Sequence, residues 1–244
     1  MTRLKGKVAI ITGGGTGIGL GAARRFVEEG AFVYLFGRRQ APLDAAVEEL
    51  GGQASAVAGS VTDPADLDRL YDAVREGHGR LDILFANAGT GSVAPLGELT
   101  RAQYDQAFDV NVRGTIDTVQ KGLPLMQAGG SIILTGSTTG VMGTPGFSLY
   151  SATKAAVRNL ARSWALDLRG TGIRVNVLSP GPTRTELAGE VVGIEAIEAL
   201  GAGTPIGRIG EPAEIGAVAA FLASDDSSFM TGGEVFADGG LAQV

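Results

Sequence analysis

The sequence predicts a single α/β domain built on a seven-stranded parallel sheet with helices on both faces. Seven short apolar runs recur along the chain with amphipathic stretches between them, an alternation typical of βαβ units. The runs show no period of two, as expected of strands that are buried on both faces. No linker-like segment interrupts the 244 residues, and α/β folds of this length close around one core, so residues 1–244 are expected to form one domain.

The expected elements follow the apolar runs and the helical intervals in chain order. The strands are expected at Val8–Thr12, Ala31–Phe36, Ala54–Ala58, Leu81–Ala86, Ser131–Thr135, Ile173–Leu178 and Glu234–Ala237. The helices are expected at Ile18–Glu29, Pro42–Leu50, Pro64–Glu76, Arg101–Gln127, Ser151–Arg169 and Pro212–Ala223. Asp63-Pro64 and Glu211-Pro212 are typical helix starts, because proline is favoured in the first turn of a helix.

Composition excludes several partners and several kinds of chemistry. The formal net charge is −6 and the basic residues are scattered, which disfavours nucleic acid and anionic membranes as partners. The absence of Cys excludes thiolate chemistry, and the single His, His78, cannot form a metal cluster or a Ser-His-Asp triad, so no metal is expected. His78 follows a helix and is expected to be a surface or capping residue. The polar Met1–Gly6 segment leaves no room for a signal peptide and the apolar runs are too short to span a bilayer, so a cytoplasmic protein is expected.

A glycine-rich turn joins the first strand to the first helix. It reads Thr12-Gly13-Gly14-Gly15-Thr16-Gly17-Ile18-Gly19. Glycines let the backbone approach a pyrophosphate, while the start of a helix presents unpaired N–H groups and a favourable dipole. The turn therefore predicts dinucleotide binding, and the alternative is a turn that only packs helix on strand.

A tyrosine and a lysine stand four residues apart at the start of a later helix. Tyr150 and Lys154 therefore share one helix face, and Ser137 follows a strand that should end at the same edge of the sheet. A free phenol titrates near pH 10, roughly, but a neighbouring ammonium favours the phenolate and lowers its pKa. The pair is thus predicted to move a proton between a carbonyl and an alcohol. The alternative is a surface tyrosine and a solvated lysine.

With these motifs in this order, the chain resembles the short-chain dehydrogenase/reductase family over nearly its whole length. The further matches are Asn87-Ala88-Gly89 after the fourth strand, Asn111 in Asp109-Val110-Asn111-Val112, Ser137 at 13 residues before Tyr150, and Pro180-Gly181 after the sixth strand. The resemblance implies a single-domain Rossmann fold and a nicotinamide cofactor that supplies the hydride, so that the protein binds, orients and exchanges a proton.

The resemblance also implies the roles of a catalytic set. Tyr150 would act as acid in reduction and base in oxidation, and Lys154 would also bind the nicotinamide ribose. Ser137 would hydrogen-bond the substrate oxygen, and Asn111 would anchor a water that links Lys154 to solvent. The alternatives for Asn111 and Ser137 are a helix-interior amide bonded to backbone and a turn hydroxyl.

The cofactor-binding residues are likewise implied by the resemblance. They are Gly13, Thr16, Gly17, Ile18, Gly19, Arg38, Arg39, Ser60, Val61, Asn87, Ala88, Gly89, Tyr150, Lys154, Pro180, Gly181, Thr183 and Thr185. Asn87 is expected to tie the loop beside the cofactor. Two positions depart from the family pattern: Ser60 stands where many members have an Asp that contacts adenine, and Thr16 where some NADP users have Arg or Lys.

The end of the second strand predicts that NADP(H) is preferred over NAD(H). Users of NAD in this family place an acidic residue there, which accepts from the ribose 2′-hydroxyl and repels a 2′-phosphate. This chain has Gly37 followed by Arg38 and Arg39, and guanidinium groups suit phosphate. The alternative is a pair of solvated arginines that opens a loop.

The sequence thus predicts an NADP(H)-dependent ketoreductase or secondary alcohol dehydrogenase, and three segments resemble bacterial alcohol dehydrogenases of the family: Phe36–Arg39, Val110–Gly114 and Asp238–Leu241. A 3-oxoacyl-[acyl-carrier-protein] reductase is the alternative. It would need a basic docking surface, to which Arg113, Arg158, Arg162 and Arg169 could contribute. From another class, a non-catalytic dinucleotide-sensing protein would not need the whole catalytic set.

The substrate and the assembly are predicted in outline. Residues 186–205 are expected to form a substrate loop, made apolar by Leu187, Val191, Val192, Ile194, Ile197 and Leu200 with a few acids, which suits a hydrophobic ketone or its alcohol. A homotetramer is expected from the resemblance and from the apolar helices Arg101–Gln127 and Ser151–Arg169. Some relatives hold a divalent ion near the C-terminal Gln243-Val244, but no ligand cluster in the sequence demands one.

Overall fold

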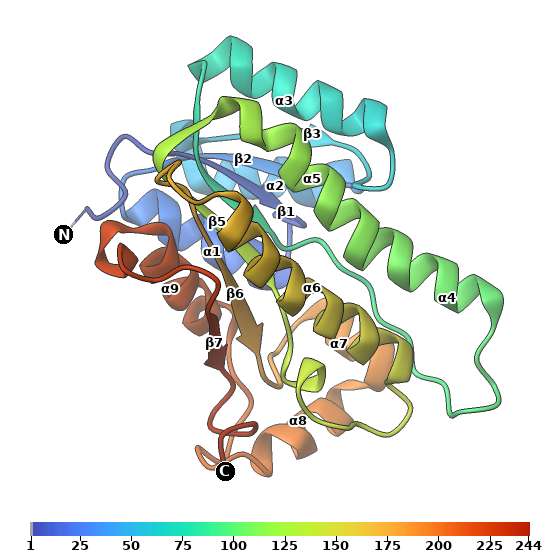
Figure 1. Ribbon diagram of the computed structural model, residues 1–244. Coiled ribbons are helices and arrows are strands. Elements are labelled where there is room, and N and C mark those ends of the chain that lie inside the picture. Colours follow the sequence, from blue (N-terminus) through green and yellow to red (C-terminus); the bar gives the residue numbers. More distant parts are fainter. Residues whose placement is uncertain (1) are drawn as a thin grey trace.

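The computed structural model describes residues 2–244 and shows one parallel sheet between two layers of helices (Figure 1). The strand order is β3-β2-β1-β4-β5-β6-β7. The strands are β1 (Val8–Thr12), β2 (Phe32–Gly37), β3 (Ala54–Ala58), β4 (Leu81–Ala86), β5 (Met126–Thr135), β6 (Arg174–Pro180) and β7 (Glu234–Ala237). The seven-stranded Rossmann fold expected from the sequence is confirmed. Strand order reverses between β1 and β4, and crevices at such reversals hold ligands in α/β proteins.

Nine helices accompany the strands within residues 2–244. They are α1 (Gly17–Glu28), α2 (Gln40–Leu50), α3 (Pro64–His78), α4 (Arg101–Phe108), α5 (Gly114–Gly122), α6 (Ser148–Asp167), α7 (Glu186–Val192), α8 (Ile194–Ala202) and α9 (Pro212–Ala223). The last residue of α3, His78, is exposed and its Nδ1 lies 2.8 Å from the Tyr34 hydroxyl, as expected of a residue at a helix end.

Two separate apolar cores lie on the two faces of the sheet. One contains buried side chains of α3, α5 and α6, and the other those of α1, α2 and α9. Successive strand residues serve opposite faces, so Ile10 belongs to the first core and Ile11 to the second. Every residue of β1 is buried, which explains why the sequence shows no alternation there.

The helices α1 and α9 touch through glycines. A Cβ atom on Gly21 would lie 2.5 Å from the Pro212 carbonyl oxygen, and one on Gly216 would lie 2.5 Å from the Gly21 carbonyl oxygen. Only glycine allows backbones to approach this closely without displacement. This contact fixes the position of α1, whose first turn forms part of the site described below.

The expected helix Arg101–Gln127 is wrong as a single element. α4 ends at Phe108, a π-helical turn follows at Asp109–Arg113, and α5 ends at Gly122, so that the chain is already a strand at Met126. Gly122 lies against the Tyr71 ring, and Pro124 in the next turn cannot continue the helix. The π turn carries Asn111, and such turns are frequent at functional sites.

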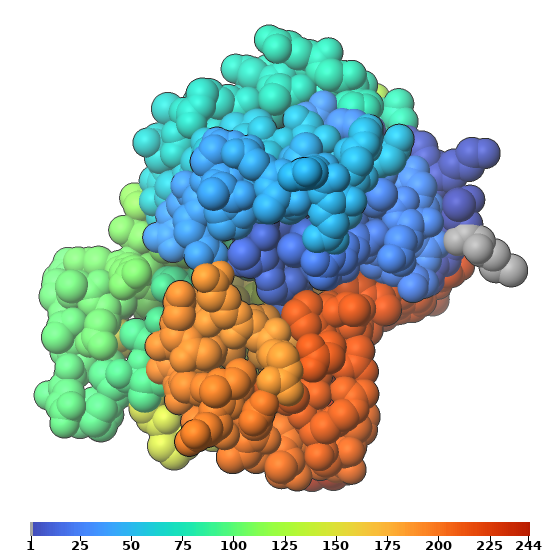
Figure 2. Space-filling model, turned by 180° about the vertical axis from the view of Figure 1, so that it is seen from behind, coloured from blue at the N-terminus to red at the C-terminus, as the bar shows by residue number. Residues whose placement is uncertain are grey.

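Residues 186–205 contain α7 and α8, which the periodicity of the sequence did not indicate. The Thr185 hydroxyl accepts from the Ala188 N–H at 3.1 Å and so begins α7, and Gly193, with φ of +87°, separates the two helices. Both helices lie beside the carboxyl ends of the strands (Figure 1). Figure 2 shows them from behind as an orange block that meets the blue N-terminal part of the molecule.

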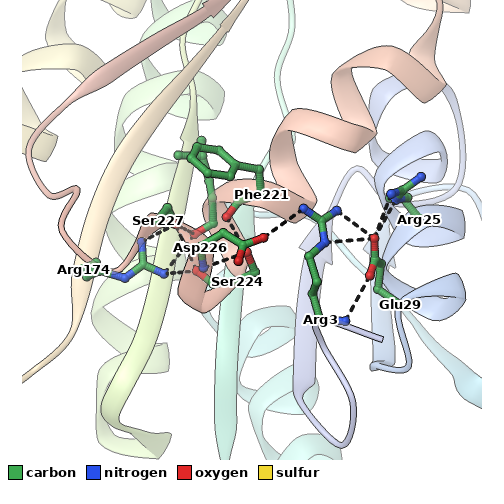
Figure 3. A network of polar contacts seen from close by, with 9 residues as sticks. Arg3, Arg25, Glu29, Arg174, Phe221, Ser224, Asp226 and Ser227 are labelled. Atoms are coloured by element: carbon green, nitrogen blue, oxygen red, sulfur yellow. Dashed lines mark hydrogen bonds and ion pairs between the residues drawn. The ribbon is translucent and has the colours of Figure 1, made fainter. Parts of the chain in front are cut away.

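A polar network lies at the amino ends of strands β1 and β6 (Figure 3). Arg3, just before β1, donates to Glu29 at 2.7 Å and to Asp226 at 3.4 Å. The hydrogen bond from Arg3 lowers the pKa of Glu29 to about 2. Arg174, the first residue of β6, is buried and donates to the Ser227 hydroxyl and to the carbonyls of Leu222, in the last turn of α9, and Ser224. These bonds satisfy a buried guanidinium and tie the amino ends of β1 and β6 to the turn after α9.

The described residues contain neither a membrane-spanning helix nor a metal-binding cluster. No helix in residues 2–244 is long and apolar enough to cross a membrane. Over the same residues no three or more His, Asp or Glu side chains gather as a metal-binding group.

Candidate active site

The glycine-rich turn forms a cradle at the carboxyl end of β1. Gly13 and Gly17 have φ of +66° and +53°, a region that other residues rarely adopt. A Cβ atom on Gly19 would lie 2.1 Å from the Gly13 carbonyl oxygen. Thr16 begins α1 without a side-chain cap, so the N–H groups of the first turn can receive an anion. These features fit the pyrophosphate of a dinucleotide.

Asn87 ties this cradle to the end of β4. The Thr12 hydroxyl accepts from the backbone N–H groups of Asn87 and Ala88 at 3.0 and 2.9 Å. The Asn87 side-chain amide donates to the Thr12 carbonyl at 3.0 Å. The geometry supports the architectural role expected of Asn87, because both strand ends are held at a fixed separation.

Tyr150 and Lys154 lie on one face of the first two turns of α6, beside the end of β5. The Lys154 Nζ atom lies 5.5 Å from the centroid of the Tyr150 ring and donates to the Thr135 carbonyl at 2.8 Å. Lys154 is buried, whereas Tyr150 is partly buried and faces a cavity. Phe147 packs edge-on against the tyrosine, with ring centroids 6.1 Å apart.

Burial acts on the two groups in opposite directions. It raises the pKa of the Tyr150 phenol above its ordinary value, while a hydrogen bond with Ser137 acts the other way. Burial lowers the pKa of the Lys154 ammonium to about 8. The pKa of Tyr150 is therefore raised overall, whereas the sequence predicted that it is lowered toward working pH. The physical reason is that desolvation dominates, and the ammonium donates to the Thr135 carbonyl.

Ser137 begins a short turn between β5 and α6. Its hydroxyl oxygen accepts from the Thr139 N–H at 3.2 Å and from the Thr139 hydroxyl at 3.0 Å. These bonds are those of a turn hydroxyl, yet the residue also lines the cavity that Tyr150 faces. A hydroxyl fixed in this way can donate its own proton to a substrate oxygen.

Asn111 uses its side chain to join three segments. Its Oδ1 accepts from the Thr90 N–H at 2.8 Å, and its Nδ2 donates to the Thr90 carbonyl at 2.9 Å and the Thr153 hydroxyl at 3.0 Å. The Thr153 hydroxyl in turn donates to the Tyr150 carbonyl at 2.7 Å. The amide is thus bonded largely to backbone, and it positions the first turn of α6. Its predicted role in anchoring a water stays a prediction.

Gly89 lies between Asn111 and Lys154. A Cβ atom on Gly89 would be 3.4 Å from Asn111 Oδ1 and 3.7 Å from Lys154 Nζ. Thr90 and Thr153, which complete this group, were missed by sequence reasoning. Nothing in their spacing marks them, since threonine in a helix commonly bonds to the preceding turn, as Thr153 does.

The two arginines that follow β2 differ in their contacts. Arg38 is exposed, whereas Arg39 forms two hydrogen bonds with the Glu186 carboxylate, at 2.9 and 2.6 Å. The hydrogen bond from Arg39 lowers the pKa of Glu186. Near them, the Ser60 hydroxyl pairs with the Thr62 hydroxyl at 2.8 Å, and its N–H donates to Asp66 at 2.7 Å.

The segment that follows β6 approaches the start of α1. A Cβ atom on Gly181 would lie 2.6 Å from the Asp238 Cα, so this position requires glycine. The Thr183 hydroxyl donates to the Gly181 carbonyl at 2.9 Å. Thr185 lies close to Gly17, because a Cβ atom on Gly17 would be 3.3 Å from Thr185 Cγ2. The segment after β6 therefore lies over the start of α1.

One cavity of about 880 Å³ connects these groups. Its walls include every predicted catalytic and cofactor-binding residue except Gly19 and Asn111. Five of the six apolar residues expected in the substrate loop also line it: Leu187, Val191, Val192, Ile197 and Leu200. Ile194 is not in the lining and its side chain is 45% exposed, because the α7–α8 junction turns it outward. Sequence reasoning missed several further apolar lining residues, among them Met142, Pro145, Phe147 and Leu241.

Comparison with known proteins places this geometry among oxidoreductases. The sequence model of the family described as Enoyl-(Acyl carrier protein) reductase matches residues 13–242. The chain is 59% identical to Oxidoreductase asL5 of Sarocladium schorii, over 99% of this chain and 98% of that protein. It is 38% identical to the NADP-dependent (R)-specific alcohol dehydrogenase of Lentilactobacillus kefiri, over 98% and 97%. The crystal structure of a 3-ketoacyl-(acyl-carrier-protein) reductase from Brucella melitensis complexed with NADH superposes with a TM-score of 0.92 at 32% identity, covering 98% of this chain and 99% of that one.

Proposed function

The chain belongs to the short-chain dehydrogenase/reductase family of oxidoreductases, whose fold binds a nicotinamide dinucleotide, and from this premise we propose that it transfers hydride between NADP(H) and a ketone or secondary alcohol. The observation that carries the proposal is that Ser137, Tyr150 and Lys154 share one cavity with the glycine-rich turn. That arrangement brings proton-transfer groups and a dinucleotide cradle to the same substrate.

The bound nicotinamide supplies or accepts the hydride. In reduction, the Ser137 hydroxyl holds the carbonyl oxygen and the Tyr150 phenol delivers a proton to it. In oxidation, the Tyr150 phenolate takes the proton from the alcohol. Burial keeps the phenol protonated, so that it can act as the acid in reduction.

Lys154 supplies a positive charge beside Tyr150. With a pKa of about 8 its ammonium is largely protonated near neutrality. In that form it stabilises a neighbouring phenolate and can donate to ribose hydroxyls. Asn111, through Thr153, holds the backbone of Tyr150, so that the phenol and the ammonium keep their relative positions.

The pocket walls favour a small hydrophobic ketone or its alcohol as substrate. The segment 186–205 supplies much of the apolar wall, and Phe147 and Met142 add to it from the other side. The four arginines considered for carrier-protein docking do not gather at this cavity. Arg113 pairs with Asp109, while Arg162 and Arg169 line a separate hollow beside the amino end of β6. This arrangement gives no support to the 3-oxoacyl-[acyl-carrier-protein] reductase alternative.

Preference for NADP(H) forms part of the proposal. Gly37 offers no carboxylate at the end of β2, and Arg38 lines the cavity there with its guanidinium exposed. The NADP dependence stated for the Lentilactobacillus kefiri relative is consistent with this. A 2′-phosphate at this position would meet a fixed cation and no acid on β2.

We also propose a homotetramer in the cytoplasm. Leu166 on α6 and Phe229 before β7 are 65% and 104% exposed, and Tyr104 on α4 is 45% exposed, which suggests surfaces that pair with other subunits. Light scattering measures this, and a stable 24.8 kDa monomer at micromolar concentration would contradict it.

The activity is tested by following NADPH oxidation across a panel of aryl ketones, aliphatic ketones, sugars and 3-oxoacyl thioesters. The proposal expects turnover with hydrophobic ketones. Turnover confined to acyl thioesters would instead support the carrier-protein reductase. NADPH binding with no turnover over the whole panel would support a dinucleotide-sensing protein.

A further inference from the structure

An ion pair spans the mouth of the cavity between two segments that are far apart in the sequence. Arg39 directly precedes α2, and Glu186 is the first residue of α7, 147 positions later. The two nitrogens at the tip of Arg39 each meet one oxygen of the Glu186 carboxylate, at 2.9 and 2.6 Å. In Figure 2 the orange α7–α8 block meets the blue N-terminal part of the molecule. The pair therefore fastens one wall of the substrate pocket to the rim of the cofactor site.

The two arginines at this rim are in different situations. Within residues 2–244, Arg38 forms no hydrogen bond or ion pair, whereas Arg39 is engaged at both of its terminal nitrogens. A second carboxylate of α7, that of Glu190, also lines the cavity and faces Arg39 without pairing with it. Two acids thus stand opposite two guanidinium groups, and only one acid is bonded.

We propose that Glu186 is a specificity-determining residue that competes with the 2′-phosphate of the cofactor for Arg39. A carboxylate and a phosphate are recognised by the same planar fork of a guanidinium, so Arg39 cannot serve both fully. A phosphate dianion near Arg38 also repels the Glu186 carboxylate. Both partners of the ion pair are about half exposed, and such pairs are weak enough to exchange. This inference rests on the proposed use of NADP(H).

Displacement of Glu186 has a consequence for the substrate pocket. Glu186 is followed on α7 by Leu187 and Val191, which belong to the apolar wall. When Arg39 turns to the phosphate, the first turn of α7 loses its bond to the segment before α2 and keeps the Thr185 cap. Cofactor binding thereby loosens the wall through which a ketone must enter.

The competition is measured with nucleotide fragments, so that no turnover is needed. Adenosine 2′,5′-bisphosphate and adenosine 5′-monophosphate are titrated calorimetrically into wild type, Glu186→Gln and the matched control Glu190→Gln at low ionic strength. Glu186→Gln should bind the bisphosphate about two- to fivefold more tightly, the range expected when an exposed ion pair no longer has to be broken. Its affinity for the monophosphate should stay unchanged, and Glu190→Gln should change less for both.

Three outcomes overturn the inference. An equal gain in affinity for the bisphosphate in both variants would show a general effect of charge. No gain in Glu186→Gln would show that, in wild type, Arg39 stays paired with Glu186 when the phosphate binds. In either case a wild-type preference for the bisphosphate would leave the proposed NADP(H) use intact. If wild type binds both fragments equally, that use and the inference fail together.

Release of α7 is measured by amide hydrogen exchange of residues 186–192. In wild type the bisphosphate should speed exchange in this segment relative to the monophosphate, and in Glu186→Gln the two ligands should give the same exchange. Unchanged or slower exchange in wild type with the bisphosphate would overturn the release of α7.

Discussion

Lys154 follows Tyr150 by one helical turn, and its Nζ atom lies 5.5 Å from the centroid of the tyrosine ring while bonding to the Thr135 carbonyl. The ammonium is thus anchored to the end of β5 and held beside the phenol. Both groups are desolvated, which favours the neutral form of each. This relationship supports the first two predictions.

Replacement of Tyr150 by phenylalanine removes only the hydroxyl that transfers the proton. The ring still packs against Phe147, so the fold and the affinity for NADPH should be retained. The value of kcat should fall by at least roughly a hundredfold, because positioned acid–base groups typically contribute 10²–10⁴. Steady-state kinetics and a fluorescence titration of NADPH measure the two quantities. Near-normal turnover would remove Tyr150 from the mechanism.

Lys154→Met should impair both turnover and cofactor affinity, since one ammonium is assigned two roles. It should also alter how stability depends on pH. The folded-state pKa of Lys154 is about 8 and its ordinary value 10.5, so between these values the unfolded chain binds a proton that the folded protein has lost. Over this window the free energy of unfolding of wild type should rise with pH relative to that of Lys154→Met.

Urea denaturation of both proteins from pH 7 to pH 10, without added cofactor, measures this difference. Titrating groups distant from Lys154 contribute equally to the two proteins and cancel in the comparison, and the Tyr150→Phe background removes the neighbouring phenol from it. Parallel pH profiles would show that Lys154 is not desolvated. A loss of turnover with unchanged cofactor affinity would contradict its double role.

A third prediction concerns the glycine-rich turn. Gly19→Ala should lower the free energy of unfolding by roughly 1–3 kcal/mol, the usual cost of overpacking, because its Cβ would lie 2.1 Å from the Gly13 carbonyl oxygen. Gly15→Ala is the matched control, since its Cβ would have no neighbour closer than 3.4 Å. Thermal and urea unfolding compare the two variants, and equal stability would mean that the turn shifts without cost.

Much of the fold could be predicted because its strands are buried on both faces. The runs Val8–Thr12, Ala54–Ala58, Leu81–Ala86 and Glu234–Ala237 have the predicted bounds in the structure. The error at residues 101–127 has a local cause. Residues 109–113 contain no Gly or Pro that would mark a break in the helix, and Asn111 gave no sign that its amide bonds to the Thr90 backbone.

Part of the site could be predicted because its motifs are local in the sequence. Spacing identified Tyr150, Lys154 and the glycine-rich turn, because each motif is local in the sequence. The contact of Arg39 with Glu186 joins segments 147 positions apart and follows from no local pattern. The direction in which the pKa of Tyr150 shifts depends on burial and on where Lys154 points, which spacing does not specify.

The last prediction is that NADPH is preferred over NADH, and the structure refines its size. Arg38 is exposed at the cavity rim, while Arg39 is engaged by Glu186, so Arg38 is the cation that meets the 2′-phosphate first. A hydrogen bond to a charged group contributes roughly 1.5–3 kcal/mol, which corresponds to about a 10- to 150-fold preference. The lower half of this range is expected, because Thr16 supplies no second cation.

The ratio of kcat/KM for NADPH and NADH measures this preference in wild type and in the double variant Gly37→Asp/Arg38→Leu. The new carboxylate would accept from the ribose 2′-hydroxyl and repel a phosphate, so the ratio should move toward NADH. A Cβ on Gly37 would have Leu43 Cδ2 at 3.8 Å as its nearest neighbour, so the substitution should not disturb the fold. A wild-type preference for NADH, or an unchanged ratio in a folded double variant, would show that these residues do not recognise the phosphate.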